Sequence, residues 1–149
     1  RQPGAFRLLS CLSLPKAKKM IEVFIEKNRV RREQIERATD EVRMRIFHKK
    51  ADPVVLEGSE EFEFMLLGAV ASIISQETNK PAFIYKRSKK EILGSVRAPS
   101  GYDTVNAMQH CAQFLDVYGG HPQASGFRTT PEKEADLRVC LVDYFKSMK

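Results

Sequence analysis

The sequence lacks an apolar run that could cross a membrane, and it has few cysteines. A membrane-spanning helix needs about 20 apolar residues, and the longest apolar stretch, residues 65–74, is about half as long. Cys11, Cys111 and Cys140 lie far apart and form no CxxC pair, which argues against a zinc site. We therefore expect three free thiols in a protein of the reducing cytoplasm.

Histidine is equally scarce, and this limits the metal chemistry of the chain. The three histidines, His48, His110 and His121, are scattered, and no aspartates accompany them at the spacing of metal ligands. The sequence therefore predicts no metal site in this chain. The remaining composition is that of a folded domain, because 42% of the 149 residues are hydrophobic.

The positive charge of the chain is concentrated in one segment. The formal net charge is +6, and residues 16–50 carry twelve Lys or Arg against six Asp or Glu. A basic segment attracts polyanions such as nucleic acid. A solvated helix with salt bridges between residues four apart accounts for the same charges equally well. The segment also lacks the interleaved aromatic residues that stack single-stranded bases.

Residues 16–50 contain neither proline nor glycine, and this predicts one long helix. One stripe recurs at spacings of three and four: Ile21, Phe24, Asn28, Arg31, Ile35, Ala38 and Val42. Asn28 and Arg31 stand where this stripe calls for core residues, and burial without partners would cost free energy. We expect them to make a polar contact across a domain boundary or to a substrate. The alternative is that the helix leaves the core there and exposes both side chains.

The rest of the chain alternates between helical and strand patterns. We expect strands at 54–56, 82–85, 91–96 and 127–129, and helices at 62–76, 104–115 and 130–148. Asp103 is a suitable N-cap, and Thr130 followed by Pro131 begins the last helix. The order predicts an α/β domain with a small mixed β-sheet flanked by helices and preceded by a long connecting helix.

The most informative segment is residues 118–127, which read Tyr-Gly-Gly-His-Pro-Gln-Ala-Ser-Gly-Phe. Glycines let backbone amides approach a ligand closely, and exposed amides in a turn suit phosphate. His121 can donate a hydrogen bond or act as an acid or base there. From the residues alone, a structural glycine turn is the plainer interpretation.

The residue pattern of this segment resembles the signature of the DHH-associated domain, which is the C-terminal substrate-binding half of DHH-superfamily phosphoesterases. The resemblance is strongest to RecJ-type exonucleases. Further blocks match in order: residues 28–36, 67–72, 80–83, 94–98 and 101–103. The resemblance runs from about residue 17 to residue 127. One departure is the acidic stretch 60–65, where RecJ-like chains usually carry His-x-Gly-Val.

The resemblance implies a site that grips a nucleic-acid phosphate. Its expected members are Gly119, Gly120, His121, Arg97, Ser95, Ser125, Gly126, Asn28 and Arg31. His121, in a rigid glycine turn, is the one candidate for a catalytic role, and the Arg97 guanidinium suits bidentate contact with phosphate. Manganese or magnesium belongs to a separate catalytic domain of the superfamily, whose Asp-His-His triplet is absent from this sequence.

The resemblance also implies an organisation and a function. Residues 1–15 are expected to be the remnant of a preceding segment, 16–50 the connecting helix and 51–149 the DHH-associated domain. The chain would then be the substrate-binding part of a 5′-3′ single-stranded-DNA exonuclease of DNA repair and recombination, inactive without its missing N-terminal catalytic domain. Two alternatives stay open: a phosphoesterase acting on short oligonucleotides or nucleotides, and a non-catalytic RecJ-related replication scaffold.

Overall fold

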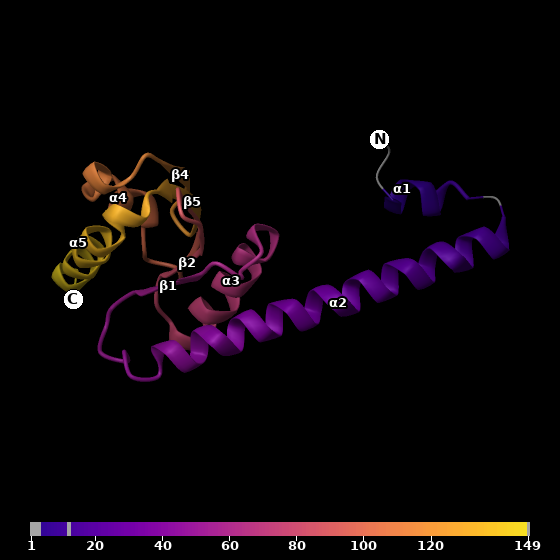
Figure 1. Cartoon of the computed structure of the whole chain (residues 1–149), viewed down its shortest axis with the longest axis horizontal. Helices are drawn as coiled ribbons and strands as arrows, with labels where there is room; N and C mark the ends of the chain where they lie inside the picture. The colour runs from indigo at the N-terminus through magenta and orange to yellow at the C-terminus, as the bar shows by residue number, and fades with distance from the viewer. Residues whose placement is uncertain (1–3, 12, 149) are drawn as a thin grey trace. The chain divides into compact units, whose positions relative to one another are not determined.

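The structure, a computed structural model, describes residues 4–11 and 13–148 and divides into two compact units, Arg1–Gln34 and Ile35–Lys149 (Figure 1). Helix α1 (Gly4–Leu9) and the beginning of α2 (Leu14–Ile46) form the first unit. The end of α2 and all strands belong to the second. No helix in these described ranges combines the length and the apolar character that crossing a membrane requires.

Helix α2 confirms the long helix expected from the sequence, although it ends at Ile46 rather than near residue 50. Only its last part has a buried stripe: Val42 is fully buried, and Ile35 and Ala38 pack beside it. Asn28 and Arg31 are exposed. The stripe thus leaves the core at the two polar positions, and both interpretations of these residues stay open.

Salt bridges along α2 account for part of its charge. Arg29 pairs with Glu26 and Glu33 at 2.6 and 2.5 Å, three and four residues away. Within the second unit, Arg43 donates to Glu77 and thereby lowers the pKa of that carboxyl. Such surface pairs contribute little to stability.

The second unit is built on a five-stranded mixed sheet of order β1-β2-β3-β5-β4. The strands are β1 (Val55–Ser59), β2 (Ala82–Arg87), β3 (Ile92–Arg97), β4 (Val117–His121) and β5 (Ala124–Thr129). Strands β1 and β2 are parallel, and the other neighbours are antiparallel. The predicted α/β class with a small mixed sheet is confirmed.

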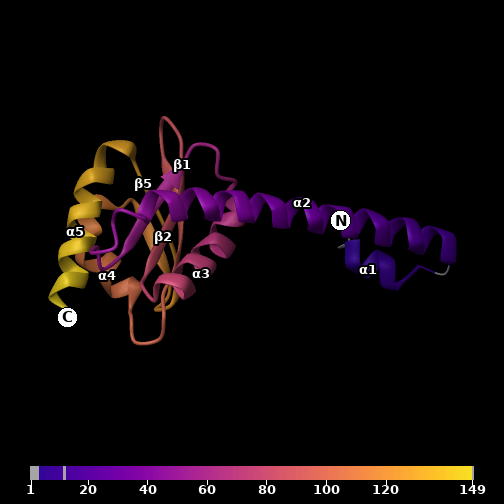
Figure 2. The same cartoon turned by 90° about the horizontal axis from the view of Figure 1, so that it is seen from below.

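Helices cover both faces of this sheet (Figure 2). The α3 face carries Val55, Ala82 and Ile84, which pack against α3 (Leu67–Thr78). The α5 face carries Phe83, Val96 and Phe127, which pack under α4 (Thr104–His110) and α5 (Glu134–Ser147). Short 3-10 turns complete the second unit at Phe64–Leu66, Ala112–Phe114 and Pro131–Lys133.

The helix expected at 62–76 starts later in the structure. A 3-10 turn occupies Phe64–Leu66, and the α-helix begins at Leu67. Met65, within this 3-10 turn, is 76% exposed. The residues that α3 does bury are Leu67, Val70, Ala71, Ile74 and Ser75. A 3-10 turn has three residues per turn rather than 3.6, so it shifts the phase of the helical stripe.

Asp103 caps α4 as predicted, and this yields a stability test. Its carboxylate accepts hydrogen bonds from the backbone N–H groups of Val105 and Asn106, both at 3.0 Å. We expect Asp103→Ala to lower the free energy of unfolding by about 1 kcal/mol. Asp143→Ala removes the same charge from an exposed position of α5 and serves as control. Equal denaturation midpoints for the two variants would contradict the cap.

The expectation of three free thiols is wrong. Cys111 and Cys140 form a disulfide, and Cys11 is free. The two residues are 29 positions apart in sequence, and the packing of α4 against α5 brings their Cα atoms to 5.9 Å. Sequence spacing alone could not reveal this pairing. Because disulfides are rare in the cytoplasm, the thiol argument for a cytoplasmic location is lost, and that location stays a prediction.

Candidate functional site

The segment with two glycines and a histidine is a strand rather than the expected turn. Gly119, Gly120 and His121 belong to β4, and Pro122 and Gln123 connect it to β5. The sequence contains no apolar alternation that marks β4, since the glycines carry no side chain. Pairing with β5 holds the segment extended at the edge of the sheet.

The sheet register lines up three rows of residues across β3, β5 and β4. The first row is Arg97, Ala124 and His121; the middle row is Ser95, Gly126 and Gly119; the third row is Leu93, Arg128 and Val117. Directly paired residues of antiparallel strands point to the same face, and so do residues two apart along a strand. All three rows therefore lie on the α3 face.

This part of the α3 face is open. Helix α3 packs against β2 and β3, so this face is left uncovered over β5 and β4. His121, Gly119 and Arg128 are exposed, while Ser95 and Arg97 are half-buried. We call these three rows the open face.

In the middle row, Gly126 and Gly119 leave the backbone bare beside the Ser95 side chain. A Cβ atom at Gly119 would meet no atom within 4 Å, and the backbone there is not in the left-handed region. The fold therefore does not require glycine at this position. What glycine provides is access, because a ligand can approach the backbone without meeting a side chain.

Gly120 and Ser125 have structural roles on the α5 face. Gly120 has a φ of 131°, and a Cβ there would lie 2.7 Å from the Ala124 carbonyl oxygen. Ser125 is buried, and its hydroxyl lies 2.6 Å from that of Thr104. Both were expected in the site, but the structure turns them away from the open face.

The link between β4 and β5 is held in place by backbone contacts. The Pro122 carbonyl accepts two hydrogen bonds from Thr104, at 2.9 Å from its N–H and 2.8 Å from its hydroxyl. The Ala98 N–H donates to the Gln123 carbonyl at 3.1 Å. These bonds fix the end of the hairpin beside the end of β3, and therefore fix His121 relative to Arg97.

Arg97 lies across the first turn of α3. Its Nη1 donates to the Val96 carbonyl at 2.8 Å, and its Nη2 would be 3.0 Å from a Cβ at Gly68. Glycine at position 68 thus leaves room for the guanidinium. Arg97 also lines a cavity of about 360 Å³, whose other lining residues are Ser72, Ser75, Gln76, Asn79, Ala98, Pro99 and Gln123. None of these is acidic, so the cavity suits an anionic or polar group.

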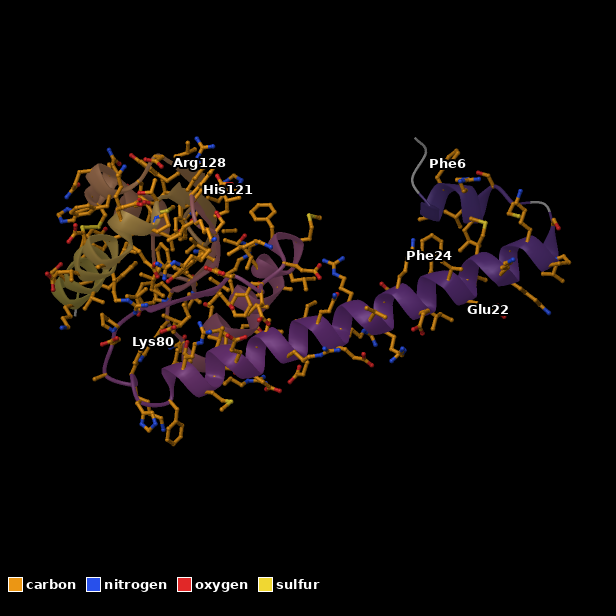
Figure 3. All side chains as sticks on the ribbon, in the orientation of Figure 1. Phe6, Glu22, Phe24, Lys80, His121 and Arg128 are labelled. Carbon is orange, nitrogen blue, oxygen red and sulfur yellow. A yellow bond between two sulfur atoms is a disulfide. The ribbon has the colours of Figure 1, made fainter. Side chains whose placement is uncertain are left out.

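His121 is exposed at the end of β4 (Figure 3). The other two histidines contact aromatic rings instead: His48 packs edge-on against Phe47, and His110 packs against Tyr144. Among the residues described, no group of three or more His, Cys, Asp or Glu gathers in a way that could hold a metal ion. The open face instead presents the guanidinium of Arg97 and the imidazole of His121, groups whose chemistry suits an anion.

Asn28 and Arg31 belong to the first unit, where both are exposed on α2. Asn28 lines a shallow cavity with Ile25, Arg29, Arg32 and Glu33. Their expected contact with a substrate or another domain stays a prediction.

One cationic residue of the open face was missed in the sequence. Arg128 was assigned to a strand but not to the site. Alternation could have found it, because Phe127 and Thr129 are buried and Arg128 between them is exposed.

Comparison with known proteins gives a consistent result. A family model described as DHHA1 domain matches residues 51–147. Single-stranded-DNA-specific exonuclease RecJ of Bacillus subtilis (strain 168) is 25% identical over 117 residues, which cover 76% of this chain and 15% of that protein. The chain therefore spans about a seventh of the length of this curated relative.

Solved RecJ structures share the fold. A structure of exonuclease RecJ bound to manganese superposes with a TM-score of 0.83 at 22% identity, over 96% of this chain and 36% of that one. RecJ from Thermus thermophilus in complex with Mn²⁺ gives 0.80 at 23% identity, over 97% of this chain and 21% of that one.

Proposed function

Because this chain belongs to the DHHA1 domain family, we propose that its open face binds the phosphate backbone of single-stranded DNA for a RecJ-like 5′-3′ exonuclease. In this proposal the chain supplies substrate binding and not the hydrolytic step. Its setting would be DNA repair or recombination.

The observation that carries the proposal is the chemistry of the first two rows. Arg97 and His121 stand at the two ends of the first row, on either side of Ala124, and the floor made by Ser95, Gly126 and Gly119 lies directly beside this row. Adjacent strands are about 4.8 Å apart, so the two cationic or hydrogen-bonding side chains originate about 10 Å from each other. A phosphate that settles on the glycine floor beside this row can receive hydrogen bonds from both side chains. Ser95 offers a hydroxyl on the same floor.

The shape of the open face suits an extended DNA strand better than a short ligand held in a closed pocket. Strand β4 is an edge of the sheet, and Gly119 and His121 on it are exposed. A DNA strand of any length can extend beyond the open face across that edge of the sheet. A phosphoesterase that selects very short oligonucleotides needs a wall that stops a longer chain.

The proposal assigns residues 51–149 to substrate binding and residues 16–50 to the helix that connects this domain to a catalytic one. The two RecJ structures matched above are named as bound to manganese or in complex with Mn²⁺. The described residues offer no cluster of donors that fits such an ion. In this proposal the ion and the residues that activate water belong to a separate catalytic domain, and this chain contributes binding and orientation.

We expect the isolated chain to bind single-stranded DNA weakly and with strong salt dependence. Each phosphate contact on a single strand contributes about −0.7 to the slope of log affinity against log salt concentration. Fluorescence anisotropy with a labelled oligothymidylate at several salt concentrations measures this slope. An affinity that does not change with salt concentration, or no binding at low salt, would refute a phosphate-binding face.

The same preparation should not degrade labelled single-stranded DNA in the presence of manganese. The reason is the missing donor cluster in the described chain. Progressive shortening from the 5′ end, retained through further purification, would show that the chain holds its own catalytic centre.

A further inference from the structure

Arg128 lies on the open face at the opposite end of the hairpin from His121. In the sheet register it stands between Leu93 and Val117, while Ala124, four residues earlier in β5, stands between Arg97 and His121. At about 3.4 Å per residue, the first and third rows are about 14 Å apart. Figure 3 labels both Arg128 and His121 on the hairpin.

The guanidinium of Arg128 is available for a ligand. Asp116 precedes β4, and its backbone N–H donates to the Arg128 carbonyl at 2.8 Å. The carboxylate of Asp116, however, accepts from Lys133 at 2.7 Å. In the part of the chain that the structure describes, no carboxylate is paired with Arg128. An exposed arginine left without an acidic partner keeps all its donors for an external anion.

The residues that pair with Arg128 across the strands have apolar side chains, which offer no acceptor to its guanidinium. Leu93 and Val117 flank Arg128 across the strands, and Val117 is 52% exposed. The methylene stem of an arginine packs against such apolar groups while its charged end stays in water. The third row therefore presents one cation on an apolar base.

Between Arg128 and the first row lies the middle row, in which Gly126 and Gly119 have no side chains. A single phosphate cannot reach both ends, because about 14 Å separates them. A chain of linked phosphates can lie along the hairpin over Gly126 and Gly119, whose missing side chains leave the path clear. We propose that Arg128 binds a second phosphate of the same strand, so that the open face accepts linked nucleotides and discriminates against a single nucleotide. This inference rests on the proposed binding of nucleic-acid phosphate at Arg97 and His121.

The test compares three variants of the full chain: Arg128→Gln, Lys146→Gln and Arg97→Gln. Lys146 is exposed on α5, the helix that covers the opposite face, so its replacement removes the same charge away from the site. The ligands are a single-stranded oligothymidylate that can span the hairpin and thymidine monophosphate. Thermal melting verifies that each variant is folded.

Arg128→Gln is expected to weaken oligothymidylate binding about ten-fold, the loss of one charge-assisted contact. Its salt slope should become shallower by about 0.7, and its affinity for thymidine monophosphate should equal that of the parent chain. Lys146→Gln should leave the salt slope unchanged.

The outcomes separate this inference from the function it rests on. If Arg97→Gln lowers the affinity for both ligands while Arg128→Gln behaves like Lys146→Gln, the proposed second phosphate contact is wrong. The proposed phosphate-binding face is then retained. If Arg128→Gln also weakens the mononucleotide, Arg128 acts at the first phosphate and the two-site arrangement is wrong. If neither Arg97→Gln nor Arg128→Gln changes binding of either ligand, the open face does not bind phosphate and both proposals fall.

Discussion

Alanine in place of His121 or Arg97 is expected to slow hydrolysis by about 10²–10³-fold in a protein that joins this chain to its catalytic domain. That magnitude is typical for removing one preorganised donor that stabilises charge in a transition state. Both side chains stand in the first row of the open face, and neither fills the core. Each variant should therefore remain folded, with a loss of stability below about 1 kcal/mol.

Single-turnover rates and thermal melting on the same preparations check this expectation. A structural role for His121 would give the reverse pattern, in which the melting temperature falls and each folded molecule keeps its normal rate. Arg128→Ala is a useful comparison, because Arg128 is proposed to bind a second phosphate. The middle row separates Arg128 from the row that binds the first phosphate. We expect Arg128→Ala to weaken binding of long strands more than it slows the chemical step.

The two consecutive glycines of β4 are expected to respond in opposite ways to alanine. Gly120→Ala should lower the free energy of unfolding by about 2–3 kcal/mol, since residue 120 has a positive φ and its Cβ would meet backbone atoms at 2.7 Å. Gly119→Ala meets no obstacle in the fold. It should leave stability equal or slightly higher, because alanine narrows the unfolded ensemble.

Binding should separate the same two variants. Gly119→Ala places a methyl group on the floor of the open face, and we expect about a ten-fold weaker affinity for single-stranded DNA, the effect of one methyl-sized misfit. Urea denaturation and anisotropy titrations of the two variants measure both quantities. Normal DNA affinity in Gly119→Ala would mean that the ligand does not approach the middle row.

The sequence was a good guide wherever local chemistry decides the structure. The cap at Asp103 depends on one side chain and the next three residues, and it was found correctly. The antiparallel pair β2 and β3 was equally accessible, because two β-type runs flank a short basic loop. The long helix followed from a stretch without proline or glycine.

The sequence failed where tertiary contacts decide. Glycines give no periodic signal, so β4 was interpreted as a turn, and the face on which Gly120 and Ser125 lie could not be assigned. The register that places Arg128 in the same face as Arg97 comes only with the assembled sheet. The disulfide between Cys111 and Cys140 likewise depends on how α4 and α5 pack.

The resemblance identified in the sequence contributed a set of residues, and the structure divides this set by geometry. Arg97, Ser95, Gly119, Gly126 and His121 share the open face. Gly120 and Ser125 support it from the α5 face. This division cannot be derived from a motif, since the motif gives order along the chain and not the side to which each residue points.

The most direct test of the open face is a titration of the ¹⁵N-labelled chain with single-stranded oligothymidylate, followed by amide chemical shifts. The account predicts that the largest shifts fall on the rows of the open face, at Ser95, Arg97, Gly119, His121 and Gly126, with Arg128 joining them only for strands and not for thymidine monophosphate. Shifts confined to residues 16–34 of α2, or spread over α5, would contradict it, because the nucleic acid would then be bound by charge elsewhere on the chain.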